Sequence, residues 1–252
     1  MSLVIKYGGN AMTDPDVLQE VAGVFAELAA ADRSPVIVHG GGPFIASALD
    51  EAGLPHHFER GLRVTTPESM VVIERVLTLL NKQLSQATGN AVGLTGRDAE
   101  LVLAERLGGN LGLVGRVISV NRELLTALLG AGITPVLTCV AVDRSGSPLN
   151  VNADEVAGAV AGALGAPVLF LSNVPGVLDD SEDKTSLLSQ LRADEVQARI
   201  ADGRVSGGMI PKLEAALDAL ELGATRAVIA SGETPDAVQN AANFEGGTTI
   251  LP

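Results

Sequence analysis

The chain of 252 residues carries 17 Lys and Arg against 30 Asp and Glu, which gives a formal net charge of −13 and a sequence pI of about 4.6. Proteins that hold nucleic acid usually present a basic stripe, so this balance argues against a nucleic-acid partner. Hydrophobic residues make up 46% and charged residues 19%, which argues against intrinsic disorder.

Short β-branched runs alternate with longer helical patterns from one end of the chain to the other. The pattern is typical of βαβ units and predicts an α/β fold with a mainly parallel sheet. Two stretches, 58–65 and 111–120, depart from it and indicate antiparallel β structure at the rim, and the charged segment 179–186 indicates a loop. The expected strands are 3–6, 35–38, 91–94, 134–140, 167–171 and 226–230, and the expected helices are 15–31, 43–51, 67–88, 123–129, 154–164, 209–222 and 235–243.

No apolar run approaches the roughly 20 residues of a membrane-spanning helix, and the first residues lead into a strand pattern without a secretory signal. We therefore expect a cytoplasmic protein without a membrane partner. The single cysteine, Cys139, lies in an apolar run, which favours a buried structural thiol. The three histidines have no metal-ligand spacing, and His39 is expected to pack or hydrogen-bond at a strand end.

Glycines gather where the expected strands end, as in Gly8-Gly9, Gly40 to Gly42 and Gly207-Gly208. Glycine lets backbone N–H groups approach a phosphate closely, and in a parallel sheet the ligand crevice lies at the carboxyl ends of the strands. For any one pair an ordinary turn is the simpler interpretation, but the joint pattern favours a phosphate crevice. The P-loop, dinucleotide-binding, protein-kinase and nucleophile-elbow signatures are all absent from the sequence.

Six motifs, in this order along the chain, resemble the amino acid kinase family and, within it, the acetylglutamate kinases. They are VIKYGGNAM from Val4, VHGGGP from Val38, GLRVT from Gly61, NVNADE from Asn150, SNVPGVL from Ser172 and GGMIPKLEAAL from Gly207. The resemblance implies an open αβα sandwich, with an acyl-substrate lobe at 1–172 and an ATP lobe at 173–252 on one continuous sheet. It also implies transfer of the ATP γ-phosphoryl group to the side-chain carboxylate of N-acetyl-L-glutamate, on the arginine pathway.

The resemblance also implies roles for three charged residues. Lys6 and Lys212 match the two catalytic lysines of the family and would stabilise the transition state, with Asp154 orienting both. Since a carboxylate is already a nucleophile, no general base is required. The alternatives are a strand-end lysine for Lys6, a solvated helical lysine for Lys212 and a helix N-cap for Asp154.

The remaining site residues carry over from the same motifs. Arg63 would hold the substrate α-carboxylate bidentately, and the amides of Asn150 and Asn152 would complete its grip. The N–H groups of Gly41 and Gly42 would face the acyl chain and the transferred phosphoryl. Magnesium is expected with the ATP, held largely by phosphates and water. The ATP-binding residues would be Gly8, Gly9, Asn173, Val174, Pro175, Gly176, Gly207 and Gly208.

The same resemblance leaves two alternative functions open and leads to an expected oligomeric state. Asn173 stands where the family often has an acid, as in related kinases of carrier-bound α-aminoadipate, although a chain at −13 is a poor docking surface for an acidic carrier. A non-catalytic ligand sensor is the other alternative. Arginine-inhibited members have an extra N-terminal helix, whereas this chain enters its first strand by Leu3, so we expect a homodimer not inhibited by arginine. The apolar helix 67–88 is the candidate interface, with core packing an equal alternative.

Overall fold

An eight-stranded sheet forms the centre of the molecule. The computed structural model describes residues 2–8, 12–31, 33–180, 183, 185–205 and 207–252. The strand order is β12-β14-β13-β11-β1-β2-β8-β5, and pairing is parallel except between β13 and β14. The strands are β1 (Leu3–Tyr7), β2 (Pro35–His39), β5 (Ala91–Leu94), β8 (Thr134–Thr138), β11 (Val168–Ser172), β12 (Gln190–Arg192), β13 (Ala227–Ser231) and β14 (Thr248–Leu251). The expected mainly parallel α/β sheet is therefore confirmed.

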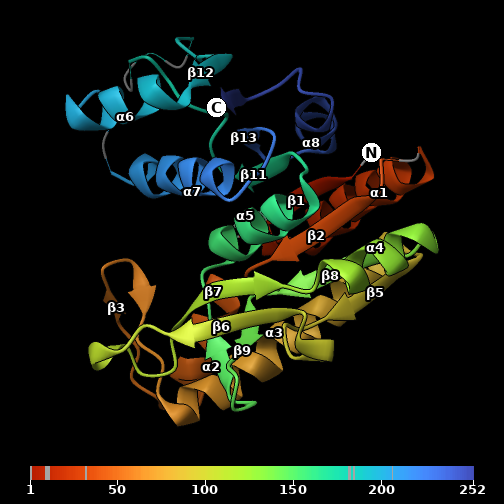
Figure 1. Ribbon diagram of the computed structural model, residues 1–252, viewed down its shortest axis with the longest axis vertical. Helices are drawn as coiled ribbons and strands as arrows, with labels where there is room; N and C mark the ends of the chain where they lie inside the picture. The colour runs from red at the N-terminus through yellow and green to blue at the C-terminus, as the bar shows by residue number, and fades with distance from the viewer. Residues whose placement is uncertain (1, 9–11, 32, 181–182, 184, 206) are drawn as a thin grey trace.

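Helices cover both faces of this sheet and complete the expected αβα sandwich (Figure 1). Alternation along β1 sorts its side chains, because Leu3, Ile5 and Tyr7 pack with α1 and α8 while Val4 packs with α5 and α7. The C-terminal part of α3 covers the face that carries Leu3, Ile5 and Tyr7, and α3 also contacts α2. The helices are α1 (Pro15–Ala30), α2 (Gly42–Glu51), α3 (Pro67–Thr88), α4 (Arg122–Gly130), α5 (Ala153–Leu164), α6 (Ala193–Ala201), α7 (Met209–Glu221) and α8 (Pro235–Ala242).

The starts of α1, α3 and α8 follow from a capping side chain and a proline, which explains why the sequence predicted these three starts closely. Asp14, Thr66 and Thr234 each accept a backbone N–H of the following turn, and each precedes a proline at the first helical position. These caps satisfy N–H groups that a helix leaves without intrahelical partners. The described residues include no helix both long and apolar enough to cross a membrane.

A second, four-stranded sheet lies at one end of the molecule, beside the hairpin of β3 (Phe58–Glu59) and β4 (Leu62–Arg63) (Figure 1). It contains β6 (Val102–Arg106), β7 (Gly115–Val120), β9 (Val140–Val142) and β10 (Pro148–Asn150). Both rim stretches predicted from the sequence are antiparallel, as β3 pairs β4 and β7 pairs β6. The expected single strand 134–140 is wrong: Thr138 Oγ1 accepts the Val140 N–H at 3.2 Å, and the chain continues into the second sheet as β9.

On the face of the sheet that carries Val4, α5 packs closely against α7, and two glycines of α5 allow this close approach. A Cβ at Gly158 would lie 3.1 Å from Ala219 Cβ, and one at Gly162 would overlap the Leu222 carbonyl oxygen and lie 2.9 Å from Leu222 Cβ. Both contacts are tighter than ordinary packing, so the helices meet at this distance because α5 lacks side chains there. The spacing matters for the site, because Asp154 is on α5 and Lys212 on α7.

Gly162→Ala is expected to destabilise the protein by about 1–3 kcal/mol, because a methyl group forced against the α7 backbone overpacks the contact. The matched control is Gly23→Ala in α1, where a Cβ meets nothing within 4 Å. That control should be neutral or stabilising by up to about 1 kcal/mol, since alanine favours a helix. Urea unfolding of the three proteins measures both effects, and a Gly162→Ala variant as stable as the control would contradict this account of the helix pair.

Candidate active site

The carboxyl end of β1 carries an ion pair to the first turn of α5. Lys6 Nζ lies 3.0 Å from Asp154 Oδ1, and the two side chains are 14% and 21% exposed. Asn152 caps α5, because its Oδ1 accepts the Asp154 N–H at 2.9 Å. The alternative interpretation of Asp154 as the N-cap is therefore wrong: its carboxylate lies inside the first turn, free of the capping role and directed to Lys6.

Lys212 joins this pair from α7. It is the fourth residue of that helix, which begins after Gly207 and Gly208, and Gly207 takes a left-handed φ of 61° that suits glycine. Burial lowers the pKa of Lys212, the charge of Lys6 lowers it further, and Asp154 opposes both. The two ammonium groups and the carboxylate therefore interact electrostatically, although they come from three elements that are distant in sequence.

Backbone from β1, β2 and α5 converges beside the ion pair. A Cβ at Gly8 would lie 3.2 Å from the Gly40 nitrogen and 3.6 Å from Lys6 Cε, and a Cβ at Gly40 would lie 3.6 Å from Ala153 Cβ. Gly9, the other expected phosphate-contacting glycine of this strand end, lies outside the described residues. The convergence brings the peptide groups of two strand ends close to Lys6, which is the placement that the phosphate-crevice prediction expects.

Gly41 and Gly42 open α2 at the end of β2, with Gly41 as its N-cap. A Cβ at Gly41 would lie 2.9 Å from Leu77 Cδ2 and 3.0 Å from Leu80 Cδ1 of α3. Packing against α3 is thus one physical reason for glycine at position 41. At Gly42 nothing lies within 4 Å of such a position.

Arg63 is held close to this backbone and is only 9% exposed. Its guanidinium donates to His56 Nδ1 at 3.0 Å and to the Gly42 carbonyl at 3.2 Å, and it stacks 4.7 Å from the ring centroid of Phe58. Burial lowers the pKa of Arg63, while Asp50 opposes that effect. Two of the five guanidinium N–H groups are used in these bonds, so others stay available to an anion.

The two asparagines expected to bind substrate differ in their surroundings. Asn150 is half-buried, and its amide donates to Thr65 Oγ1 at 3.0 Å. Asn152 is exposed, although its amide oxygen is already used as the α5 cap. Both flank the N-terminus of α5, yet in this conformation each amide has an internal partner.

A cleft of about 830 Å³ lies in front of Asp154, and we call it the α5–α7 cleft. It includes Asn152 and Asp154, together with several groups that the sequence reasoning missed. Among those are two cations, Arg60 at the β3–β4 tip and Arg116, which pairs with Glu105 at 2.7 Å. Its lining comprises Arg60 to Leu62, Arg116 to Val120, Asn152, Asp154, Glu155, Ala159, Ala163, Pro211, Glu214, Ala215, Asp218, Glu221 and Leu222.

Two of these missed residues adjoin or lie within motifs quoted from the sequence. Arg60 immediately precedes the GLRVT motif and has a left-handed φ of 51°, next to Gly61 at 79°. A two-residue hairpin turn with positive φ at both positions favours Asn or Gly, so Arg60 is an unusual occupant. Glu155 lies within the NVNADE motif, and its carboxylate accepts the Val117 N–H at 2.6 Å, which ties β7 to α5.

Apart from Gly8 and Gly9, the residues expected to border ATP follow the carboxyl end of β11 or precede α7. Asn173 and Pro175 are exposed, Val174 is half-buried and Gly176 is buried. Gly176 has a φ of 149°, and a Cβ there would lie 2.7 Å from Thr248 Oγ1. Packing against β14 is therefore one physical reason for glycine at this position.

His39 and Cys139 have the buried roles expected of them. His39 is fully buried at the end of β2, where its Nδ1 lies 2.8 Å from the Gly40 carbonyl oxygen. Burial raises the pKa of the Cys139 thiol to about 11, so the thiol stays protonated and unreactive at neutral pH.

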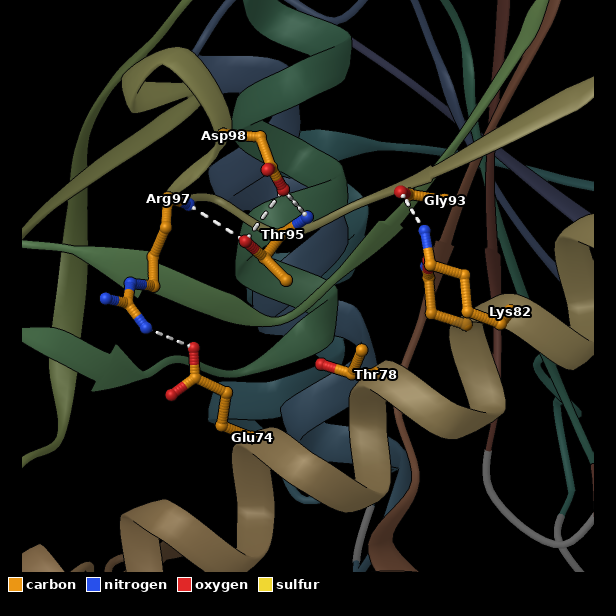
Figure 2. Close-up of a pocket in the computed structure, with 8 residues that line it drawn as sticks. Glu74, Thr78, Lys82, Gly93, Thr95, Arg97 and Asp98 are labelled. Atoms are coloured by element: carbon orange, nitrogen blue, oxygen red, sulfur yellow. Dashed lines mark hydrogen bonds and ion pairs between the residues drawn. The ribbon is translucent and has the colours of Figure 1, made fainter.

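A second cavity, of about 450 Å³, lies between α3 and the segment that follows β5 (Figure 2). Its charged groups are paired with close neighbours: Arg97 with Glu74 at 2.6 Å, Lys82 with the Gly93 carbonyl at 2.9 Å, and Asp98 with the Thr95 N–H at 2.7 Å. It shares no lining residue with the α5–α7 cleft. Among the described residues, no three His, Cys, Asp or Glu are grouped to hold a metal ion.

Known proteins match this chain over most or all of its length. The profile of the Amino acid kinase family matches residues 1–231. The chain belongs to the amino acid kinase family. It is 54% identical over 250 residues to the acetylglutamate kinase of Deinococcus radiodurans, covering 99% of this chain and 100% of that relative. It is 41% identical over 271 residues to the acetylglutamate kinase of Agrobacterium fabrum, covering 100% of this chain and 91% of that one.

A solved structure supports the fold assignment. The crystal structure of smu.665 from Streptococcus mutans UA159 superposes with a TM-score of 0.80 at 29% identity, covering 99% of this chain and 98% of that one. The resemblance and the open αβα fold predicted from the sequence are therefore confirmed. Membership in the family also explains why Lys6, Asp154 and Lys212, which no local pattern links, come together at one end of the sheet.

Asp154→Asn is expected to lower the pKa of Lys212 further, because the carboxylate is the group that raises it against burial and Lys6. Glu155→Gln is the matched control, since it removes the same charge from the neighbouring residue and keeps an acceptor for Val117. NMR titration of the lysine ε-methylene groups, with Lys212→Arg for assignment, measures the shift. An equal shift in both variants, or none in Asp154→Asn, would contradict the arrangement described here.

Proposed function

We propose that this protein is an acetylglutamate kinase, which transfers the γ-phosphoryl group of ATP to the side-chain carboxylate of N-acetyl-L-glutamate in arginine biosynthesis. The single observation that carries the proposal is the meeting of Lys6, Asp154 and Lys212 at the carboxyl ends of the strands. The full-length relatives named acetylglutamate kinase support the same activity.

The chemistry of the step matches the side chains at the site. A carboxylate oxygen attacks the γ-phosphorus, the bond from that phosphorus to the β,γ-bridging oxygen breaks, and ADP leaves with the electron pair. No proton is transferred, so no general base is needed. Catalysis then requires alignment and neutralisation of the charge that spreads over the moving phosphoryl group.

Lys6 and Lys212 supply that neutralisation from two different elements of the fold. Their ammonium groups would contact the phosphoryl oxygens in the transition state, where each fixed donor contributes most. Asp154 would hold Lys6 in place through the 3.0 Å ion pair and favour the charged form of Lys212. The mutual repulsion of the two lysines is relieved when a negatively charged phosphoryl group lies between them.

Substrate recognition would come from the β4 end and the turn before α5. Arg63 would take the α-carboxylate of N-acetyl-L-glutamate with its remaining N–H groups, and Gly41 and Gly42 would offer backbone donors beside it. Asn150 and Asn152 would exchange their internal hydrogen bonds for the substrate on binding. Arg60 and Arg116 also line the α5–α7 cleft, where five acidic residues accompany them.

ATP would lie along the other half of the sheet, against Gly8, Gly9, Asn173 to Gly176 and Gly207-Gly208. We propose an acyl-substrate lobe at 1–172 and an ATP lobe at 173–252, divided where β11 ends at Ser172. β11 pairs with β1 on one side and β13 on the other, so the sheet is continuous across this boundary. Magnesium would enter with the nucleotide, held by phosphates and water, and we propose that the reaction takes place in the cytoplasm.

Turnover assays with Mg-ATP and three acceptors test the function directly. ADP release and hydroxylamine trapping of the acyl phosphate are expected with N-acetyl-L-glutamate and not with free glutamate or α-aminoadipate. The blocked amine distinguishes the first acceptor, because a free ammonium group beside Arg63 would be repelled. Tight ATP binding without turnover on any of the three would contradict the proposal and favour a carrier-bound acceptor or a ligand sensor.

Lys6→Ala and Lys212→Ala should each lower kcat by about a hundredfold or more, since each removes one transition-state donor. Lys82→Ala is the matched control, because that lysine lies in the second cavity and donates to the Gly93 carbonyl. Its kcat should stay close to that of the unchanged protein. Near-normal turnover of either variant would contradict the catalytic role proposed for that lysine.

We also propose a homodimer formed through α3. Its outer face exposes Val71 and Leu79, at 68% and 62%, while other residues of the helix pack in the core. Val71→Asp with Leu79→Asp should therefore yield a monomer by light scattering. Leu107→Asp, on the loop after β6, should leave the dimer intact, and a monomeric unchanged protein would contradict the proposal.

A further inference from the structure

A buried polar pair lies behind the glycine turn at the end of β2. His39 is fully buried and Asn81 of α3 is 2% exposed. The Asn81 amide nitrogen lies 3.1 Å from His39 Nε2 and 2.9 Å from the Val136 carbonyl of β8, and His39 Nδ1 lies 2.8 Å from the Gly40 carbonyl. Polar groups at this depth are costly unless every hydrogen bond is made, so the arrangement is specific.

The hydrogen bonds fix which imidazole nitrogen carries the proton. The Asn81 amide nitrogen can only donate, so it gives one proton to Val136 and the other to His39 Nε2, which must accept. Nδ1 then carries the proton and donates it to the Gly40 carbonyl. Burial lowers the pKa of His39 to about 4, so the ring is neutral at physiological pH.

The direction of the Gly40 carbonyl decides where the Gly41 N–H points. In a planar trans peptide the C=O and the next N–H point in opposite directions. His39 holds the carbonyl on the α3 side of the sheet, so the Gly41 N–H points toward the opposite side, where Lys6 and Asp154 lie. No residue in the described part of the chain accepts a hydrogen bond from this N–H, whereas the Gly40 N–H is used by the Tyr7 carbonyl at 3.3 Å.

Asn81 is itself held from the far side by β5. A Cβ at Gly93 would overlap Asn81 Oδ1 and lie 2.8 Å from Ser85 Oγ, so the side chain packs directly on the β5 backbone. The amide therefore cannot rotate freely, and its direction is transmitted through His39 to the peptide.

We propose that His39 and Asn81 are positioning residues, which aim the Gly41 N–H at the phosphoryl group transferred between ATP and the acceptor carboxylate. The inference rests on the proposed function for the identity of the group that the N–H meets. A freely rotating peptide could turn this donor away, and a donor held in advance contributes more in the transition state than in the ground state. Neither side chain touches the substrate.

The tautomer can be tested on the unchanged protein, without any assumption about activity. Nitrogen-15 NMR of the imidazole ring, with His39→Gln assigning the signals among the three histidines, should show a neutral ring protonated at Nδ1. A ring protonated at Nε2 would overturn the proposal, because it could not donate to Gly40. This measurement stands even if N-acetyl-L-glutamate proves not to be the acceptor.

Two substitutions of similar polarity then separate positioning from stability. The amide nitrogen of an asparagine reaches the place of imidazole Nδ1, whereas that of a glutamine reaches the place of Nε2. His39→Asn keeps the donor to Gly40 and His39→Gln loses it. We expect kcat to fall by about tenfold or more in His39→Gln, with the KM for both substrates little changed, and His39→Asn to recover several-fold of that loss.

The outcomes separate the two proposals. A loss of kcat equal in both variants, or no loss in His39→Gln, would overturn the positioning role. If the unchanged protein does not phosphorylate N-acetyl-L-glutamate, the proposed function fails, and the tautomer alone decides whether His39 holds the Gly40 peptide. Should His39→Gln fail to fold, the same NMR measurement on Asn81→Leu should show loss of the Nδ1-protonated form, and its persistence would overturn the role of Asn81.

Discussion

The 3.0 Å ion pair between Lys6 and Asp154 is the interaction around which the site is arranged. It links the central strand of the sheet to the first turn of α5, and both groups are largely removed from water. A partly buried pair of this kind contributes modestly to stability, since desolvation offsets much of the attraction. Its value here is positional, because it fixes one ammonium group at the strand ends and gives Lys212 a counter-charge within electrostatic reach.

Most of the other contacts at the site come from the backbone. Close approaches at Gly8 and Gly41 leave little room for a side chain, and Gly40 lies in ordinary contact distance of Ala153 on α5. Peptide groups suit the recognition of phosphoryl oxygens, because they carry fixed dipoles and need no rotamer ordering. The cost is that peptide orientation must be enforced from outside, and the pair of His39 and Asn81 provides that enforcement from the opposite face of the sheet.

The strongly negative chain is compatible with the proposed anionic substrates because charge is distributed unevenly. Lys6 and Lys212 share the carboxylate of Asp154, so the two ammonium groups exceed the negative charge beside them. Screening limits the reach of surface charges to roughly 8–10 Å at physiological ionic strength, so acids farther away on the surface contribute little to the field at these three groups. Global charge therefore excluded a nucleic-acid surface without bearing on a small-anion site.

The sequence by itself determined most of the strands of the central sheet and all of its helices except α6, because periodicity, N-caps and prolines act within a few residues. It also indicated Lys6, Asp154, Lys212 and Arg63 through motifs long enough to be specific. It missed the short strands β6, β9, β10, β12 and β14, which gain stability only by pairing with other strands, and it missed the helix α6. Only the tertiary structure decided that Asn152 rather than Asp154 caps α5 and that Arg60 and Glu155 border the α5–α7 cleft. Likewise, Asn81 reaches His39 from 42 residues away, because such contacts depend on packing between elements that no local pattern encodes.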